Sequence, residues 1–440
     1  MQTHFPAEKL ADPAMRDSET ALRKCVHCGF CTSTCPTYVE LGDELDSPRG
    51  RIVLMKAMLE EGRPATPRDV LHIDRCLSCL SCVTTCPSGV NYMHLVDQAR
   101  AWIEQSYRRP PGDRWLRSVL AWVLPHRSRF RLALRFAQLA RPLGKTGLMP
   151  ARLRAMLAMV PGRVPAPSAV DRPQRFEALG ARRMRVALLG GCVQPVLAPH
   201  INESTVRLLT RLGCEVLIPP GAGCCGALTV HMGKEARGQA AARANVDAWW
   251  RLHQEAPLDA IVINASGCGT TVKDYGRLLR MDPAYAPRAA MLAALARDVT
   301  EIVALLGLGK PSALLPLKVT YHAPCSLQHG QQIRAAPPQL LREAGFQVRE
   351  PAEAHLCCGS AGTYNILQPA IATRLQRRKM QAIERTAPQI VATGNIGCLK
   401  QLAVATDVPV VHTVELLDWA TGGPVPPAMN QDRRPSGTVK

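Results

Sequence analysis

From Arg185 onward, short apolar runs rich in β-branched residues alternate with longer amphipathic stretches. The runs have the length of buried strands and occur at 186–189, 215–218 and 261–264. The longer stretches have the helical spacing of apolar positions and cover 202–212, 234–252 and 270–279. Alternation of this kind predicts a parallel sheet with right-handed crossovers.

This pattern occurs twice. Arg185–Cys192 aligns with Lys318–Cys325 at an offset of 133 residues, and Cys224-Cys225-Gly226 aligns with Cys357-Cys358-Gly359 at the same offset. The stretch that ends at Cys268 aligns with the one that ends at Cys398, here at an offset of 130. A repeat of this length indicates a duplicated domain rather than a solenoid, whose units are shorter.

The N-terminal part of the chain is predicted to be helical. Residues 50–61 place Ile52, Met55 and Leu59 at helical spacing, and Gly62, Pro64 and Pro67 follow as helix breakers. A proline-rich passage at 161–173 marks a further boundary.

Two runs of cysteine flank the helix predicted at 50–61. Cys25-x2-Cys28-x2-Cys31-x3-Cys35-Pro36 and Cys76-x2-Cys79-x2-Cys82-x3-Cys86-Pro87 both have the spacing that binds a [4Fe–4S] cluster. In such motifs the cysteine before proline commonly ligates the cluster of the other run. We therefore assign Cys25, Cys28, Cys31 and Cys86 to one cluster and Cys76, Cys79, Cys82 and Cys35 to the second.

The pattern fits two other uses of cysteine less well. Structural zinc sites generally use separated cysteine pairs rather than three evenly spaced residues before Cys-Pro. Disulfide frameworks belong to short secreted chains, whereas this chain has 440 residues, 17 cysteines and no signal-like segment at Met1–Leu10. No stretch approaches 18 uninterrupted apolar residues, so no transmembrane helix is expected.

Each repeat adds four cysteines after its predicted strands, where ligands collect in open α/β sheets. They are Cys192, Cys224, Cys225 and Cys268 in the first repeat and Cys325, Cys357, Cys358 and Cys398 in the second. They could hold a further cluster or zinc, or they could be buried apolar thiols, as is expected of Cys214. Hydrogen-bonding roles are favoured for the nearby His231, His322, His329 and His355. Gly221–Gly226 matches G-x-G-x-x-G, but the second repeat keeps only Cys-Cys-Gly, so nucleotide binding is not expected.

The net charge of +19 is concentrated in one segment. Between residues 101 and 165, thirteen Arg or Lys face only Glu104 and Asp113, and Trp102, Trp115 and Trp122 lie among them. This composition favours helices on an anionic membrane surface or an acidic partner, and a solvated helical linker is the alternative. Nothing in the chain resembles a module that reads bases, so no nucleic acid is expected.

These patterns predict an α/β chain with an N-terminal α-helical ferredoxin-like module and two repeated parallel α/β cysteine-rich domains. The predicted divisions are a two-cluster domain at 16–100, a basic helical linker at 101–180, cysteine-rich repeats at 181–310 and 311–421, and a disordered tail at 422–440.

The chain resembles the iron–sulfur subunits of membrane-linked dehydrogenases, and within that group those of glycolate oxidase (glycolate dehydrogenase). The strings that carry the resemblance are Lys24–Cys31, Leu41–Ile52 and Ala392–Cys398, and the likeness runs from about residue 16 to 420. In heterodisulfide reductase relatives the repeat pattern ends in Cys-x2-Cys, whereas Cys268 and Cys398 each stand alone, which leaves a cluster in the repeats open.

The resemblance implies a complex in which flavoprotein subunits oxidise glycolate to glyoxylate. This chain would pass the electrons through two [4Fe–4S] clusters to a membrane quinone or another acceptor, in the cytoplasm or peripherally on the inner face of the membrane. None of its residues is assigned a catalytic role. The alternatives are a lactate or glycerol-3-phosphate dehydrogenase subunit, a heterodisulfide-reductase-like thiol catalyst, and a zinc-stabilised module. Arg49 and Arg51 either lie beside a cluster, where positive charge would raise its potential, or pair with Asp43, Glu44 or Asp46.

Overall fold

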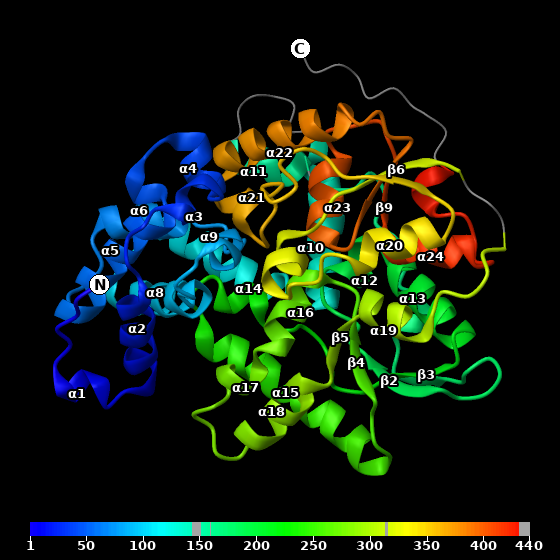
Figure 1. Cartoon of the computed structure of the whole chain (residues 1–440), viewed down its shortest axis with the longest axis horizontal. Helices are drawn as coiled ribbons and strands as arrows, with labels where there is room; N and C mark the ends of the chain where they lie inside the picture. The colour runs from blue at the N-terminus through cyan, green and yellow to red at the C-terminus, as the bar shows by residue number, and fades with distance from the viewer. Residues whose placement is uncertain (143–150, 159, 313–315, 431–440) are drawn as a thin grey trace.

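The computed structural model describes residues 1–142, 151–158, 160–312 and 316–430, and it joins an N-terminal helical module to two α/β units (Figure 1). The fold class predicted from the sequence is confirmed. The helices that precede the first sheet are α1 (Ala7–Leu10), α2 (Pro13–Lys24), α3 (Phe30–Ser33), α4 (Pro36–Leu41), η1 (Glu44–Asp46), α5 (Pro48–Glu61), α6 (Pro67–Asp74), α7 (Ser81–Thr85), α8 (Tyr92–Ser106), α9 (Pro111–Val123), α10 (Arg127–Ala140), α11 (Ala151–Ala158) and η3 (Ala169–Asp171).

Helix α5 is the central helix of the N-terminal module and contains the helix predicted at 50–61. Ser47 caps its start by accepting a hydrogen bond from the Gly50 amide, Pro48 occupies the first turn, and Gly62 ends it with a left-handed backbone (φ 70°). The module's core packs apolar side chains of α5 against those of α2, α6 and α8. The fully buried members are Leu22, Met55, Met58, Leu59, Ile73, Val96, Ala99 and Ile103.

Two sheets follow with the same strand arrangement. The first has the order β1-β3-β2-β4-β5, in which only β1 is antiparallel, and the second has the order β7-β6-β8-β9, parallel throughout. The order β3-β2-β4-β5 in one repeat corresponds to β7-β6-β8-β9 in the other. The strands are β1 (Gln174–Phe176), β2 (Met184–Leu188), β3 (Cys214–Ile218), β4 (Ala260–Ile263), β5 (Ala296–Asp298), β6 (Lys318–Tyr321), β7 (Gln347–Arg349), β8 (Ile390–Thr393) and β9 (Val410–His412).

Helices connect these strands and cover their faces. Those of the first repeat are α12 (Gln194–Leu197), α13 (His200–Arg211), α14 (Ala227–Val230), α15 (Glu235–Glu255), α16 (Ser266–Lys273), α17 (Tyr275–Leu278), α18 (Ala286–Ala294) and α19 (Val299–Leu306). Those of the second are η4 (Ser326–Gly330), α20 (Ala336–Glu343), α21 (Tyr364–Leu367), α22 (Pro369–Glu384), α23 (Ile396–Ala403), α24 (Thr413–Ala420) and η5 (Pro427–Met429).

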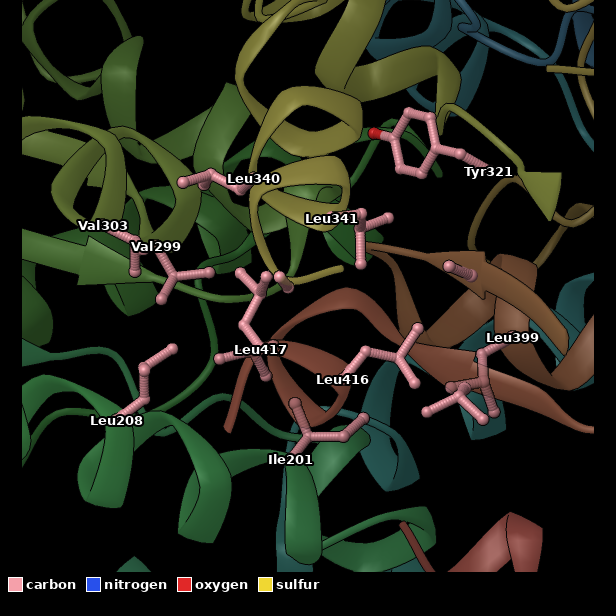
Figure 2. Packing of buried hydrophobic residues seen from close by; sticks show 14 of the residues in the cluster. Ile201, Leu208, Val299, Val303, Tyr321, Leu340, Leu341, Leu399, Leu416 and Leu417 are labelled. Atoms are coloured by element: carbon pink, nitrogen blue, oxygen red, sulfur yellow. The ribbon is translucent and has the colours of Figure 1, made fainter. Parts of the chain in front are cut away.

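The two repeats share one apolar core. Helix α13 of the first repeat packs against α24 of the second, and α19 of the first packs against α20 of the second. Because α13 is equivalent to α20 and α19 to α24, the two contacts between the repeats are equivalent. Figure 2 shows side chains of all four helices, among them Leu208, Val303, Leu341 and Leu417, converging between the sheets. At the edge of this core, Arg207 and Arg211 both pair with the buried carboxylate of Asp418. The sheets are therefore held in a fixed relation.

The structure differs in detail from two of the predicted divisions. Within 101–180, residues up to Ser106 belong to α8 and β1 joins the first sheet. Within 422–440, Ala428 and Met429 pack against the shared core. Residues 143–150, 159 and 431–440, including Lys145 and most of the predicted tail, lie outside the described residues, as do 313–315 near the start of the second repeat.

Part of the basic segment packs onto the rest of the chain. Arg109 and Arg117 are buried and both pair with Asp74 of the N-terminal module, at 2.6 and 2.7 Å. Burial alone would raise the pKa of Asp74, but Arg117 and Arg109 hold it below its usual value. Sequence counting within the segment missed this partner because Asp74 lies on a different helix.

Candidate metal centres

Both four-cysteine motifs form the same loop. The residues on either side of the second cysteine have left-handed backbone in each: His27 (φ 55°) and Gly29 (φ 85°), then Ser78 (φ 50°) and Leu80 (φ 63°). Residues other than glycine rarely adopt this backbone conformation, so its recurrence at Leu80, where the first motif has Gly29, indicates a constrained site. The reversals curl each loop so that its first three cysteines line a common hollow.

The eight cysteines divide between two adjacent hollows. The first is lined by Cys25, Cys28, Cys31 and Cys86, and Cys82 also lines it. The second is lined by Cys35, Cys76, Cys79 and Cys82. Each cysteine before proline thus lies with the first three cysteines of the other motif, in the sets expected from the spacing. That these sulfurs are cluster ligands stays a prediction.

The two hollows are neighbours. Pro48, Cys82 and Tyr92 line both of them. The hydroxyl of Tyr92 lies 3.7 Å from the Cys76 sulfur, and Arg100 donates to the Cys76 carbonyl at 2.6 Å. The second loop is therefore tied to α8, which fixes its position relative to the first.

The electrostatics of these sulfurs suit a cationic group. Burial raises the pKa of Cys31 to about 11, and it raises the pKa values of Cys79 and Cys82 well above the ordinary thiol value, with neighbouring sulfurs adding to the effect. Several crowded thiolates would repel one another in this low-dielectric surrounding unless iron neutralised them. Four sulfurs facing one hollow therefore fit a [4Fe–4S] cluster, and binding would release their protons.

Arg51 and Arg49 occupy different surroundings. Arg51 is buried, donates to the His72 carbonyl at 2.7 Å, pairs with Asp46 at 3.3 Å and lies 3.8 Å from the Cys35 sulfur. Burial alone would lower its pKa, but Cys76, Tyr92 and Cys35 raise it, so the guanidinium stays charged. Arg49 lines the first hollow and pairs with Glu44 at 2.5 Å, so each arginine both lies beside a cysteine hollow and forms an ion pair.

The four cysteines of the first repeat converge at the carboxyl ends of its strands. Cys192 follows β2, Cys224 and Cys225 follow β3, and Cys268 lies on α16 after β4. The Cys224 sulfur lies close to those of Cys192 and Cys225, and the Cys225 sulfur lies close to that of Cys268. Cys214 is fully buried within β3, as expected of an apolar thiol.

The second repeat brings its cysteines together in the same way and adds a histidine. The sulfurs of Cys325 and Cys357 lie 3.8 Å apart, and Cys358 is in contact with Cys357 and Cys398. One ring nitrogen of His322 and the sulfurs of Cys358 and Cys398 all lie within 4.8 Å of one another, and all three residues are buried. Burial, together with nearby Lys379, lowers the pKa of His322 to about 3, so its imidazole is neutral.

The second hollow touches this cysteine group. Leu77 and Cys79 pack in one apolar cluster with Cys357, and Cys325 packs against that cluster. The hydroxyl of Tyr364 also donates to the Arg75 carbonyl at 2.9 Å. The N-terminal module is therefore joined to the second repeat at its cysteines.

Two of the remaining histidines near these cysteines, His329 and His231, have hydrogen-bond partners for their rings. His329 contacts Thr84 at 2.7 Å and the His355 carbonyl at 3.1 Å, and His231 contacts Asp97 at 3.2 Å. The sequence predicted a hydrogen-bonding role for His322 too, but its ring nitrogens have no hydrogen-bond partner among the residues that the structure describes, and one of them lies beside two thiols. None of the helices in the described parts of the chain is both long and apolar enough to cross a bilayer.

Comparisons with known proteins agree with this arrangement. A 4Fe-4S dicluster domain matches residues 21–90, and a cysteine-rich domain matches residues 186–273 and 319–403. The glycolate oxidase iron-sulfur subunit of Escherichia coli (strain K12) is 42% identical over 420 residues, which cover 96% of this chain and 99% of that protein. The probable glycolate oxidase iron-sulfur subunit of Bacillus subtilis (strain 168) is 34% identical over 429 residues, 92% of this chain and 96% of that protein. Lactate utilization protein A of Bacillus subtilis (strain 168) is 28% identical over 242 residues, 53% of this chain and 99% of that protein.

Proposed function

Because this chain belongs to the family of glycolate oxidase iron-sulfur subunits, we propose that it carries electrons away from a flavoprotein that oxidises glycolate to glyoxylate. The sequence lacks a flavin-binding fingerprint, so the hydride or electron pair must first be taken up by another subunit. Iron–sulfur clusters then pass the electrons on singly. In this proposal the electrons finally reach a membrane quinone or another oxidant.

One observation carries the proposal: two four-cysteine hollows lie side by side and share walls at Pro48, Cys82 and Tyr92. In the proposal, each hollow holds one [4Fe–4S] cluster. The ligands of the first cluster are Cys25, Cys28, Cys31 and Cys86, and those of the second are Cys35, Cys76, Cys79 and Cys82. Adjacent clusters allow an electron to pass directly between them. The described residues 16–106 would then form the domain that holds both of these clusters.

We place the flavoprotein contact beside the first cluster. Cys28 is exposed there, and Val26 and Phe30 on either side of it are 67% and 62% exposed. Large apolar side chains this open to solvent are typical of interaction surfaces. A partner seated on them would lie directly over the cluster edge that is nearest to solvent.

A second surface suits an anionic membrane. Trp115 and Trp122 on α9 and Phe136 and Leu139 on α10 are all more than half exposed. Exposed arginines, Arg114 and Arg135 among them, lie on the same two helices. Apolar side chains among cationic ones allow a helix to lie in the lipid headgroup region. This surface would bring the chain to a quinone pool on the inner face of the cell membrane.

The test is to purify the chain with its flavoprotein under anaerobic conditions and add glycolate, lactate or glycerol 3-phosphate. We expect glycolate to produce the EPR signal of reduced clusters, and a Cys79→Ser variant to lose the signal of the second cluster. Reduction by lactate alone would move the chain to a lactate dehydrogenase complex. Oxidation of glycolate by the isolated chain, or zinc without iron in the N-terminal module, would contradict the proposal.

A further inference from the structure

We propose that the second cysteine-rich repeat holds a further metal centre and that His322 is one of its ligands. His322 provides an imidazole nitrogen, and Cys358 and Cys398 provide sulfurs, with these atoms within 4.8 Å of one another. Imidazole and thiolate together suit iron and zinc. The proposal concerns a site separate from the two N-terminal hollows, and it does not depend on which substrate feeds the complex.

The buried imidazole of His322 has no hydrogen-bond partner within the part of the chain that the structure describes, which is the second observation for a bound metal. It follows β6 directly, its backbone amide donates to the Ala392 carbonyl at 2.8 Å, and its side chain is 1% exposed. Neither of its ring nitrogens has a hydrogen-bond partner among the described residues. A buried polar group without a partner is rare and points to an unseen ligand or ion. A metal between the nitrogen and the two sulfurs would occupy one of these nitrogens.

Two further thiols extend the donor set. The sulfurs of Cys325 and Cys357 are 3.8 Å apart. Two thiolates on one tetrahedral metal, each at about 2.3 Å, stand about 3.8 Å apart, so this pair already has the required separation. Five donors exceed the four that a single tetrahedral ion takes, and adjacent Cys357 and Cys358 cannot easily chelate one ion. The set therefore favours a centre with more than one metal atom.

The first repeat has no such imidazole. Leu189 takes the position of His322, since its amide donates to the Val262 carbonyl at 3.0 Å just as His322 donates to Ala392. Leu189 is 2% exposed and belongs to the apolar core of its repeat. The two repeats share a backbone and four cysteines but differ at this residue. The substitution His322→Leu thus converts the second site into a copy of the first.

The location gives this centre a consequence for electron transfer. Cys79 of the second hollow belongs to the same buried cluster as Cys357, so an iron-containing centre would lie near the second cluster. Replacing thiolate by imidazole raises the potential of an iron–sulfur centre, as the contrast between Rieske and plant-type clusters shows. An electron on the reduced second cluster would then pass to the oxidised centre in the repeat.

The test uses the full chain, purified anaerobically, with iron, sulfide and zinc counted per chain. We expect metal beyond that of two [4Fe–4S] clusters in the native chain, loss of that excess in His322→Leu, and unchanged EPR signals from the N-terminal clusters. His322→Cys should keep the metal but lose the nitrogen signature, read by pulsed EPR for iron or by the zinc-edge absorption spectrum. His329→Leu is the control, because His329 is buried but has partners for both nitrogens.

Two outcomes would overturn the proposal: a native chain with no metal beyond the two clusters, or a His322→Leu chain that keeps the full excess. If His322→Leu also loses the N-terminal signals, it has misfolded and His322→Cys decides. A nitrogen signature that persists in His322→Cys contradicts ligation by this residue. Because these readouts count metal, they stand whether or not glycolate reduces the clusters.

Discussion

Nη1 of Arg51 lies 3.8 Å from Sγ of Cys35, a predicted ligand of the second cluster. Asp46 accepts from the same guanidinium and also pairs with Arg75 at 2.7 Å, so the arginine is fixed rather than mobile. This places a permanent positive charge and a donor against one sulfur of that hollow. Both features favour the reduced state of a bound cluster.

Replacing Arg51 by Met should lower the reduction potential of the second cluster by about 120 mV. A unit charge at roughly 6 Å and an effective dielectric constant of about 20 interacts by roughly 3 kcal/mol, and about 1.4 kcal/mol corresponds to 59 mV for one electron. Potentiometric EPR titration measures the shift, and Arg51→Lys should restore part of it.

Arg49→Met is the matched control on the same helix. Arg49 is partly exposed and pairs with Glu44, so its substitution should leave the second cluster unchanged. Equal shifts in both variants would mean that Arg51 acts through the overall charge of the chain.

The crossing of the fourth cysteines can be tested by exchanging each for serine. Cys86→Ser should perturb the first cluster and spare the second, and Cys35→Ser should do the reverse, because these residues line opposite hollows. The signal whose potential responds to Arg51→Met identifies the second cluster. If that signal survives in Cys35→Ser and disappears in Cys86→Ser, each motif ligates its own cluster.

Phe30→Ser should weaken binding of the flavoprotein by roughly fivefold or more, since apolar anchors at the centre of an interface commonly contribute more than 1 kcal/mol. Phe30 is 62% exposed, so the iron content of the chain should not change. Isothermal titration calorimetry or biolayer interferometry measures the affinity. Trp115→Ser serves as the control and should leave this affinity intact, whereas an unchanged affinity in Phe30→Ser places the partner elsewhere.

Exchanging Trp122 and Phe136 for serine should weaken binding to vesicles that contain anionic lipid, by roughly fivefold for each residue. The two side chains are 53% and 64% exposed, so little folding energy should be lost. Co-sedimentation with vesicles of mixed neutral and anionic lipid measures the effect, and Phe30→Ser is the control. If the native chain binds purely neutral vesicles as tightly as vesicles with anionic lipid, the arginines of this surface do not contribute to binding.

Glu415→Gln should flatten the pH dependence of stability. Burial raises the pKa of Glu415 to about 7 from 4.5. Between these values the native state binds more protons than the unfolded state, so the free energy of unfolding falls as pH rises, by up to roughly 3 kcal/mol. Gln keeps the hydrogen bond from the His412 amide without the ionisation. Denaturation at pH 5 and pH 8 should show a smaller difference in the variant, and an equal difference would assign the effect to another group.

Much of this protein could be predicted from local sequence. The helix at 50–61, the strands near 186–189, 215–218 and 261–264, and the duplication follow from apolar periodicity and from motifs that recur at a constant offset. The cluster motifs are local for the same reason, because a few residues of spacing decide whether three sulfurs can face one point. Even the crossing of Cys35 and Cys86 was predictable, since a proline directs each of these residues away from its own loop.

Tertiary structure decided what depends on residues far apart in the chain. Arg51 could pair at the surface or approach a sulfur, and only packing against His72 and Cys35 buried it. Asp74 forms ion pairs with two arginines of the basic segment, whose positive charge has few acidic partners within the segment itself. His322 lies beside Cys358 and Cys398 because β6 is placed between β7 and β8 in a parallel sheet. Periodicity reports which face of an element is buried, but the identity of the group buried against it is set by chain topology.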